Sequence, residues 1–405
     1  MTTAATLRSM APSAFLPALV YEIANGAVAP VIALSALSLK GSTGTAALML
    51  ALLGVGRVLG DVPAAYLADR LGELRAMLLA AGVSAIAFLV CGFSTSLVTL
   101  GVGLTALGAC SAAFYLARQT YIMDVAPVRM RARAMSSLAG AHRIGLFLGP
   151  FLGAAAIGIG GLRGAYVVAA IASALTGVLL SVVRSAGPPT PVDAPLVRPS
   201  SSRAMLAGHR RLFATLGIAV LGVGAVRAGR QTVLPLWAEH LHINAQTTSV
   251  VFGIAGAADM FLFYPAGKAM DELGRLSVAL PAMTIMGVSM VVLPLTNEVR
   301  WLTVVAVAMS VGNGIGSGIM MTLGADAAPG PGRVPFLGLW RLVGDAGNAV
   351  GPVIIAVIAS IFGLAAGIVT IGVVGVLSAA GLLRWTPRYT PYATRRAIRA
   401  ARDGP

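Results

Sequence analysis

The sequence predicts an all-α integral membrane protein in which twelve transmembrane helices form two pseudo-symmetric six-helix bundles. Three observations support this fold class. First, 57% of the 405 residues are hydrophobic and only 11% are charged, whereas soluble domains carry about 25% charged residues. Second, apolar stretches of membrane-spanning length recur along the whole chain. Third, a short polar motif in the first half returns in the second half at a fixed distance.

Twelve segments appear when the chain is read at the length of about 20 apolar residues that a bilayer requires. They lie at about 13–38, 45–68, 75–95, 98–124, 135–158, 163–183, 211–237, 246–270, 276–296, 300–324, 335–361 and 364–385. The longest polar run, from Arg184 to Arg211, is rich in proline and serine and separates six segments from six. We therefore expect an N-terminal bundle at 1–184, a cytoplasmic linker at 185–210, a C-terminal bundle at 211–386 and a basic cytoplasmic tail at 387–405.

An internal repeat relates the two halves. Asp69 and Gly72 lie in a polar turn between two apolar segments, and Asp271 and Gly274 follow at a distance of 202 residues. A Gly-Pro pair and an Asp-Xaa-Ala-Pro sequence recur at the same distance. Because one spacing holds across several separate positions, we interpret the chain as two copies of one unit.

The charge distribution predicts the orientation of the chain. The net charge is +15, and arginine is concentrated in the linker, the tail and alternate turns, which follows the positive-inside rule and does not indicate nucleic-acid binding. We expect a multi-pass protein of the cytoplasmic (plasma) membrane, which is the inner membrane of a cell that has two. Both termini should lie on the cytoplasmic side. Cys91 and Cys110 lie in apolar segments, so no disulfide framework is indicated.

The repeated turn resembles the loop motif of major facilitator superfamily transporters, roughly G-x-x-x-D-R-x-G-R-R. The matching residues are Asp69, Arg70, Gly72 and Arg75 in the first copy, and Gly267, Asp271, Gly274 and Arg275 in the second. Ala65 replaces the leading glycine, and Glu73 and Glu272 stand where an arginine is usual. The resemblance covers nearly the whole chain except the linker and the tail. It implies the fold of that superfamily, whose two parallel six-helix repeats are a known symmetry of secondary transporters.

This loop motif also suggests a mechanical role. A carboxylate at a cytoplasmic helix end can accept hydrogen bonds from the N-terminus of a facing helix, and an arginine can bridge to it. We expect Asp69, with Arg70 and Arg131, to latch the two halves together on the cytoplasmic side, which is the role that the resemblance also implies.

A second motif lies in the fifth predicted helix. The residues Gly145, Gly149, Pro150 and Gly153 resemble the G-x-x-x-G-P-x-x-G-G motif of drug:proton antiporters, although Ala154 replaces the last glycine. Glycines four residues apart leave one helix face bare, so another helix can lie close and seal a path. The alternative is the ordinary packing of small residues. We favour the antiporter interpretation, which implies the 12-helix group of efflux and multidrug-resistance transporters.

Charged residues within the predicted spans are candidate functional residues, because charge inside a bilayer is costly. They are Glu22, Arg57, Asp61, Arg118, His142, Arg143, Arg227, Arg230, Asp259, Arg341 and Asp345. Burial disfavours a charged carboxylate, so proton binding can be coupled to transport. The candidates for this coupling are Glu22, Asp61, Asp259 and Asp345, together with Arg118. For Glu22, the alternative is a structural ion pair with Arg143 or Arg118.

The repeat places opposite charges at equivalent positions, because Asp259 and Asp345 follow Arg57 and Arg143 by 202 residues. In the superfamily fold, helix 2 faces helix 11 and helix 5 faces helix 8. The resemblance therefore implies two pairs between the halves, Arg57 with Asp345 and Arg143 with Asp259, which would hold one access state. The alternative is that each charge is satisfied within its own half, for example Arg57 by Asp61.

These observations predict a secondary transporter that exports small amphiphilic molecules or drugs by proton-coupled alternating access. The residues expected to line its cavity are Glu22, Asn25, Tyr115, Arg143, Arg227, Arg230, Gln231 and Arg341. Arg227 and Arg230 share a helix face and leave open a proton-coupled symporter or exchanger of a small organic anion. A transport-fold sensor is a third class, against which the buried acids and the loop motif argue.

From the sequence we expect that this protein is not an enzyme. The sequence contains no P-loop, no zinc-ligand spacing and only four histidines, so we expect no ATP hydrolysis, no metal and no cofactor. The expected partners are a small-molecule substrate, protons and the lipid bilayer. Two six-helix halves suffice for a carrier that works as a monomer.

Overall fold

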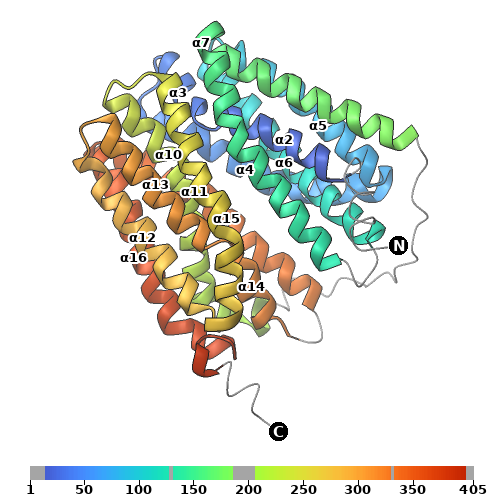
Figure 1. The fold of residues 1–405 in the computed structure, drawn as a ribbon, viewed down its shortest axis with the longest axis vertical. Helices are drawn as coiled ribbons and strands as arrows, with labels where there is room; N and C mark the ends of the chain where they lie inside the picture. Colours follow the sequence, from blue (N-terminus) through green and yellow to red (C-terminus); the bar gives the residue numbers. More distant parts are fainter. Residues whose placement is uncertain (1–13, 127–130, 186–205, 330–332, 398–405) are drawn as a thin grey trace. The chain divides into compact units, whose positions relative to one another are not determined.

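The computed structural model describes residues 14–126, 131–185, 206–329 and 333–397 (Figure 1). These ranges contain helices and no β-strand. Eleven helical stretches within them are long and apolar enough to cross a membrane. The longest, Ala134–Val182, holds 49 residues and contains two of the segments expected from the sequence. The all-α, twelve-span membrane fold class is therefore confirmed.

The long helix α7 (Arg131–Ser185) is broken at Gly160 and Gly161, whose backbone angles are not helical. Gly161 has a φ of +61°, a left-handed conformation that glycine adopts without the steric cost of a Cβ atom. The break falls between the segments predicted at about 135–158 and 163–183. Two membrane spans thus follow each other with almost no connecting loop.

The chain divides into two compact units, one of Met1–Pro195 with His242–Gly253 and one of Leu196–Leu241 with Ile254–Pro405. The first unit holds α2 (Leu16–Val28), α3 (Val31–Ser38), α4 (Thr43–Leu71), α5 (Glu73–Gly92), α6 (Leu97–Val125) and α7. The second holds α9 (Arg210–Leu212), η3 (Phe213–Gly217), α10 (Ile218–His240), most of α11 (Ala245–Leu273), α12 (Leu276–Val292), η4 (Leu293–Leu295), α13 (Val299–Ile315), α14 (Ile319–Ala327), α15 (Arg333–Phe362) and α16 (Leu364–Tyr389).

Small residues bring the helices of the first unit together. In this unit α2 packs along α7, α4 packs along α6, and α5 packs against α6 and α7. Gly56 of α4 lies against the backbone of Thr105 in α6, and Gly145 and Gly149 of α7 lie against the backbone of α2. Glycine leaves no side chain in the contact, so the helices approach closely where lipid supplies no hydrophobic drive for association.

The second unit uses the same packing at equivalent positions. There α10 packs along α15 and α16, and α12 packs along α13 and α16. Gly347 and Gly351 of α15 lie against the backbone of α10, 202 residues after Gly145 and Gly149. Glycine packing at the antiporter motif is therefore a property of both halves, in keeping with the packing alternative. Membership of the drug:proton antiporter group stays a prediction.

Two predicted spans are interrupted helices in the structure. The first is divided into α2 and α3 at Pro30, because proline lacks the backbone N–H that continues a helix. The span predicted at about 300–324 is divided into α13 and α14, with Gly318 between them at a φ of +80°. Four glycines and an asparagine within 312–318 lower the helical propensity of this stretch.

Candidate functional site

A buried polar cluster lies in the first unit. It consists of Glu22 and Asn25 of α2, Tyr115 and Arg118 of α6, and His142 of α7, and we call it the Glu22 cluster. Residues three apart share a helix face, so α2 and α6 each present two of these side chains together. Sequence analysis selected four of the five as site residues, and the structure brings those four into contact.

Glu22 is the centre of this cluster and is completely buried. Its Oε2 accepts hydrogen bonds from the Tyr115 hydroxyl at 3.2 Å and from Nδ2 of Asn25 at 3.3 Å. Its Oε1 lies 3.6 Å from Nη1 of Arg118 and 2.8 Å from Nδ1 of His142. A buried carboxylate is costly unless charged and hydrogen-bonding partners offset its desolvation. These four side chains are such partners, and Arg118 forms the local ion pair that the sequence left open.

His142 is the member of the cluster that sequence analysis did not assign to the site. It stands three residues before Gly145 and therefore shares its face of α7. A Cβ atom on Gly145 would lie 2.6 Å from Cβ of Glu22, so the two helices are close enough for the imidazole to reach the carboxylate. The spacing between His142 and the glycine motif is the signal that could have identified this contact.

Aromatic rings and a second arginine surround the cluster. The guanidinium groups of Arg118 and Arg57 lie 4.9 and 6.0 Å from the ring centre of Tyr115, within the range of cation–π attraction. Tyr21 stacks on Phe114 with ring centres 3.9 Å apart. Among the described residues, Nε of Arg57 and Nε of Arg118 are buried without a hydrogen-bond partner. Arg118 beside the Glu22 carboxylate and Arg57 beside Tyr115 therefore each retain an unused donor.

The second unit holds a different polar cluster around the two arginines of α10. Arg227 donates from Nη2 to the carbonyl oxygens of Asn313 at 3.4 Å and Gly316 at 2.9 Å. Arg230 donates from Nη1 to the Ser310 hydroxyl at 2.9 Å. The last carbonyl groups of a helix have no partner within it and carry partial negative charge. Arg227 therefore stabilises the end of α13 at its break from α14.

The predicted acids of the second unit have partners within that unit. Asp259 accepts a hydrogen bond from Nδ2 of Asn313 at 2.8 Å. Asp345 lies 3.6 Å from Nε of Arg341, one turn earlier in α15, and accepts a bond from Asn348 at 3.4 Å. Because a proton on either acid would weaken these contacts, both remain candidates for proton coupling.

Three further predicted site residues differ in their burial. Asp61 of α4 and Arg143 of α7 are half-buried, and Gln231 of α10 is exposed. Within the described ranges, no three His, Cys, Asp or Glu side chains are grouped as a metal site. Two predicted pairs join residues of different units and stay predictions: Arg57 with Asp345, and Arg143 with Asp259.

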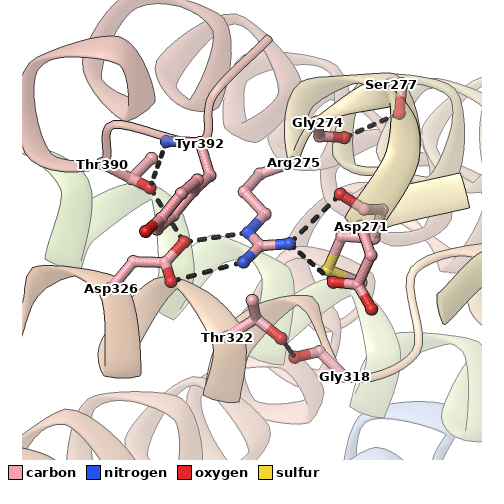
Figure 2. A network of polar contacts seen from close by, with 10 residues as sticks. Asp271, Gly274, Arg275, Ser277, Gly318, Thr322, Asp326, Thr390 and Tyr392 are labelled. Atoms are coloured by element: carbon pink, nitrogen blue, oxygen red, sulfur yellow. Dashed lines mark hydrogen bonds and ion pairs between the residues drawn. The ribbon is translucent and has the colours of Figure 1, made fainter. Parts of the chain in front are cut away.

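The second copy of the loop motif forms a polar network at the end of α11 (Figure 2). Arg275 donates from Nη1 to Asp271 at 3.0 Å, and from Nε and Nη2 to Asp326 of α14 at 2.9 and 3.4 Å. Asp326 also accepts a bond from the Thr390 hydroxyl at 2.8 Å. Burial lowers the pKa of Arg275, but its contacts with Asp326 and Asp271 outweigh this effect and raise it overall. The loop motif predicted two members of this network but not Asp326 or Thr390.

The chain after α16 completes the network. The backbone N–H groups of Arg275 and Leu276 donate to the carbonyl oxygens of Tyr392 and Ala393, both at 3.0 Å. Gly274 has a φ of +101°, and a Cβ atom there would lie 2.7 Å from backbone of the same C-terminal segment. Only glycine combines this backbone conformation with so close an approach, which accounts for the glycine in this copy of the motif.

The first copy of the motif differs at the central position. Glu73 stands 202 residues before Arg275, so an acid replaces the base that organises the network in the second unit. Asp69 and Arg70 are exposed. The side chain of Arg131 lies outside the described part of the structure, and the latch between Asp69 and Arg131 stays a prediction.

Asp326→Asn is expected to destabilise the second unit by about 1–3 kcal/mol, because it removes a charge-assisted partner from a largely buried guanidinium. The side chains of Arg275 and Asp326 are each only 11% exposed. Thermal unfolding of the purified protein in detergent measures this effect. Glu272→Gln is the matched control, since its pair with Lys268 is exposed and should contribute less than about 1 kcal/mol. Equal melting temperatures for both variants would contradict the proposed importance of the network.

Solved structures similar to this chain are membrane transporters. A bacterial homologue of the human lysosomal transporter Spinster is 14% identical, with a TM-score of 0.71 over 96% of this chain and 97% of that chain. A D-xylose–proton symporter is 16% identical, with a TM-score of 0.70 over 96% and 99%. A POT family transporter in complex with 5-aminolevulinic acid is 14% identical, with a TM-score of 0.69 over 93% and 96%. At these identities the likeness concerns the fold. No curated protein matches the chain in sequence.

The family comparison covers both halves of the chain. The family model of the Major Facilitator Superfamily matches residues 14–334 and 216–403. These ranges include both copies of the loop motif and the helices that build the Glu22 cluster. The chain therefore belongs to the Major Facilitator Superfamily of membrane transporters.

Proposed function

We propose that this transporter exports small amphiphilic molecules or drugs in exchange for protons, and that Glu22 carries the coupled proton. The observation that carries the proposal is a completely buried carboxylate held by Arg118, His142, Tyr115 and Asn25. Most of these contacts favour the charged form of the carboxyl group. Protonation would weaken them together and so change the relative stability of two access states.

The proposal extends to partners and location. The carrier would bind a small-molecule substrate and protons, and would work as a monomer in the plasma membrane with both termini in the cytoplasm. The concentration of arginine in the linker and tail supports this orientation.

Proton flux in proteoliposomes tests this function. Purified protein is reconstituted with a pH-sensitive dye inside the vesicles, and a panel of cationic, neutral and anionic compounds is added outside. Antiport predicts that a compound entering the vesicles drives protons out, and that Glu22→Gln abolishes the signal. Proton movement in the same direction as the compound would contradict antiport, and no flux with any compound of the panel would count against amphiphile export.

Symport or exchange of a small organic anion is the second candidate function. Arg230 supports it, because its Nη1 donates to the neutral hydroxyl of Ser310 and its Nε is buried without a hydrogen-bond partner among the described residues. An anionic group would satisfy such a donor. Anion transport should fall by about tenfold or more in Arg230→Gln, whereas Arg300→Gln on an exposed helix end should leave it unchanged. Anion transport that is equal in the two variants would remove Arg230 from the site.

The charge pairs between halves are part of the same proposal. Arg57 would bind Asp345, and Arg143 would bind Asp259, in one of the access states. The double exchange Arg57→Asp with Asp345→Arg should recover at least part of the transport that each single exchange removes, because it restores opposite charges. The contact between Asp345 and Arg341 within α15 is the competing arrangement. If the double exchange recovers nothing, the pair does not form.

A further inference from the structure

The structure carries an inference about the route of the proton, which rests on the proposed function of Glu22. We propose that His142 exchanges the proton between the accessible side and the buried carboxylate, so that the two side chains form one proton-binding site. This assigns a role to a residue that neither the loop motif nor the antiporter motif includes. His142 is a positioning and relay group in this proposal, whereas Glu22 is the group that couples the proton to transport.

Exposure and distance together define the direction of this relay. Nδ1 of His142 lies 2.8 Å from Oε1 of Glu22, and the His142 side chain is 34% exposed whereas that of Glu22 is 1% exposed. Neither atom has an aligned hydrogen bond to another described residue. The imidazole is therefore the more accessible end of the contact, and in the proposed relay it receives the proton first. Imidazole is suited to this step, since it is the side chain whose ordinary pKa lies between about 5 and 8.

Polar and ionisable groups near this pair come from α2, α4, α6 and α7. Besides Glu22 itself, α2 contributes the ionisable Tyr21 and the neutral amide of Asn25. Tyr115 and Arg118 of α6 contact Glu22, Arg57 of α4 lies 6.0 Å from the ring centre of Tyr115, and Arg143 follows His142 in α7. Arg118 stabilises the carboxylate and opposes a second positive charge on the imidazole. Arg118 and His142 both contact the Glu22 carboxylate. A single proton on this carboxylate would therefore weaken both contacts.

The internal repeat supports a specific role for these three residues. The positions 202 residues after Glu22, Arg118 and His142 are Gly224, Met320 and Gly344. These three also meet in the second unit, because a Cβ atom on Gly224 would lie 2.5 Å from the carbonyl oxygen of Gly344, and one on Gly344 would collide with the Met320 side chain. The same helix junction is thus apolar in one half and ionisable in the other. Packing alone does not require the acid, the arginine and the imidazole.

The relay step is a proton transfer without any other bond change. A hydronium ion on the accessible side gives a proton to Nε2 of neutral His142, which leaves a water molecule and forms the imidazolium. The Nδ1–H bond of His142 then breaks, an O–H bond forms on Oε1 of Glu22, and the imidazole becomes neutral again. The ion pair of Glu22 with Arg118 loses its negative partner at this point. Release of the proton reverses these steps.

Histidine NMR of the purified protein in detergent tests the coupling without any substrate. The chain has four histidines, so His142→Gln assigns the resonance of His142 by its disappearance. The pH dependence of this resonance should differ between the wild-type protein and Glu22→Gln, because Glu22→Gln removes the carboxylate that faces Nδ1 of His142 at 2.8 Å. His240→Gln, which removes an exposed imidazole of α10, should leave that pH dependence unchanged.

The infrared band of protonated carboxyl groups supplies the reciprocal measurement. If the two groups are coupled, the pH dependence of the Glu22 carboxyl band in His142→Gln should differ from that in the wild-type protein. A His142 resonance whose pH dependence is the same with and without the Glu22 carboxylate would overturn the proposal. If His142→Gln fails to fold, His142→Asn provides the assignment. If His142 and Glu22 are coupled but no compound of the panel drives proton flux, the proposed function is contradicted. The pairing of the two side chains would still hold.

Discussion

Glu22→Gln is expected to abolish proton-driven accumulation of the transported compound while leaving a folded protein. Glutamine keeps the size of the side chain but cannot take up the coupled proton, and it loses the charge-assisted contact with Arg118. A hydrogen bond to a charged group contributes about 1.5–3 kcal/mol, which corresponds to about a tenfold to hundredfold change in an equilibrium. Accumulation driven by a pH gradient in proteoliposomes should therefore fall at least about tenfold.

The control for this result is Glu239→Gln, which removes an exposed carboxyl group near the end of α10. It should accumulate the compound as the wild-type protein does. Accumulation that persists in Glu22→Gln would show that another acid, such as Asp259 or Asp345, carries the proton. Melting temperatures of both variants must also be compared, because a misfolded Glu22→Gln protein would mimic a loss of coupling.

Gly149→Ala is expected to disrupt the packing of α2 against α7 in the first unit. A Cβ atom there would lie 2.7 Å from the backbone N of Ala27 and 2.7 Å from Cα of Gly26, so α2 and α7 would have to separate. Backbone atoms cannot rotate away as the end of a side chain can, and overpacking of this kind costs about 1–3 kcal/mol. The expected results are a lower melting temperature in detergent and a weaker contact between Glu22 and His142, since the same helix pair positions both.

Gly140→Ala is the matched control for this substitution. It also lies in α7, but a Cβ atom at this position would meet nothing within 4 Å. Alanine should stabilise the helix there by about 0.5–1 kcal/mol relative to glycine. If the two alanine variants melted at the same temperature, close approach of α2 and α7 would not depend on the glycine motif.

The fold could be predicted from the sequence because membrane spans leave a simple signal. Each span needs about 20 apolar residues, and the repeat distance of 202 residues divides the chain into equivalent halves. The breaks at Pro30 and Gly318 were missed, since a hydrophobic segment reads the same whether its helix is continuous or interrupted. What distinguishes them is local backbone chemistry, and the proline at position 30 and the glycine-rich stretch before Gly318 are its signals in the sequence.

The candidate site could be predicted in part. The sequence predicts Glu22 and Arg118 as functional residues because charge in a lipid environment is rare and costly, and it adds Asn25 and Tyr115 as cavity residues. Their mutual contacts depend on how α2, α6 and α7 pack, which sequence spacing within one helix does not determine. His142 was a charged candidate without an assigned role, although its distance of three residues from Gly145 places it on the face that packs against α2.

Arg227 illustrates the opposite case. It was selected as a cavity residue because a charge in a predicted span is a functional candidate. In the structure its guanidinium binds the last carbonyl groups of α13, a role created by a helix break that the sequence did not predict. An intramembrane charge can therefore stabilise the backbone of a neighbouring helix. The proposed role of Arg230 depends on the hydrogen-bond donors of Arg230 and not on its proximity to Arg227.

The central claim is that the buried Glu22 carboxylate couples substrate movement to a proton, and substrate exchange at equal pH tests it most directly. With a labelled compound from the panel, exchange across the vesicle membrane needs binding and alternating access but no net proton movement. We predict that Glu22→Gln retains exchange and loses accumulation driven by a pH gradient. If exchange and accumulation are lost together in a folded variant, Glu22 acts in substrate binding or in the access change itself, and the account of proton coupling is wrong.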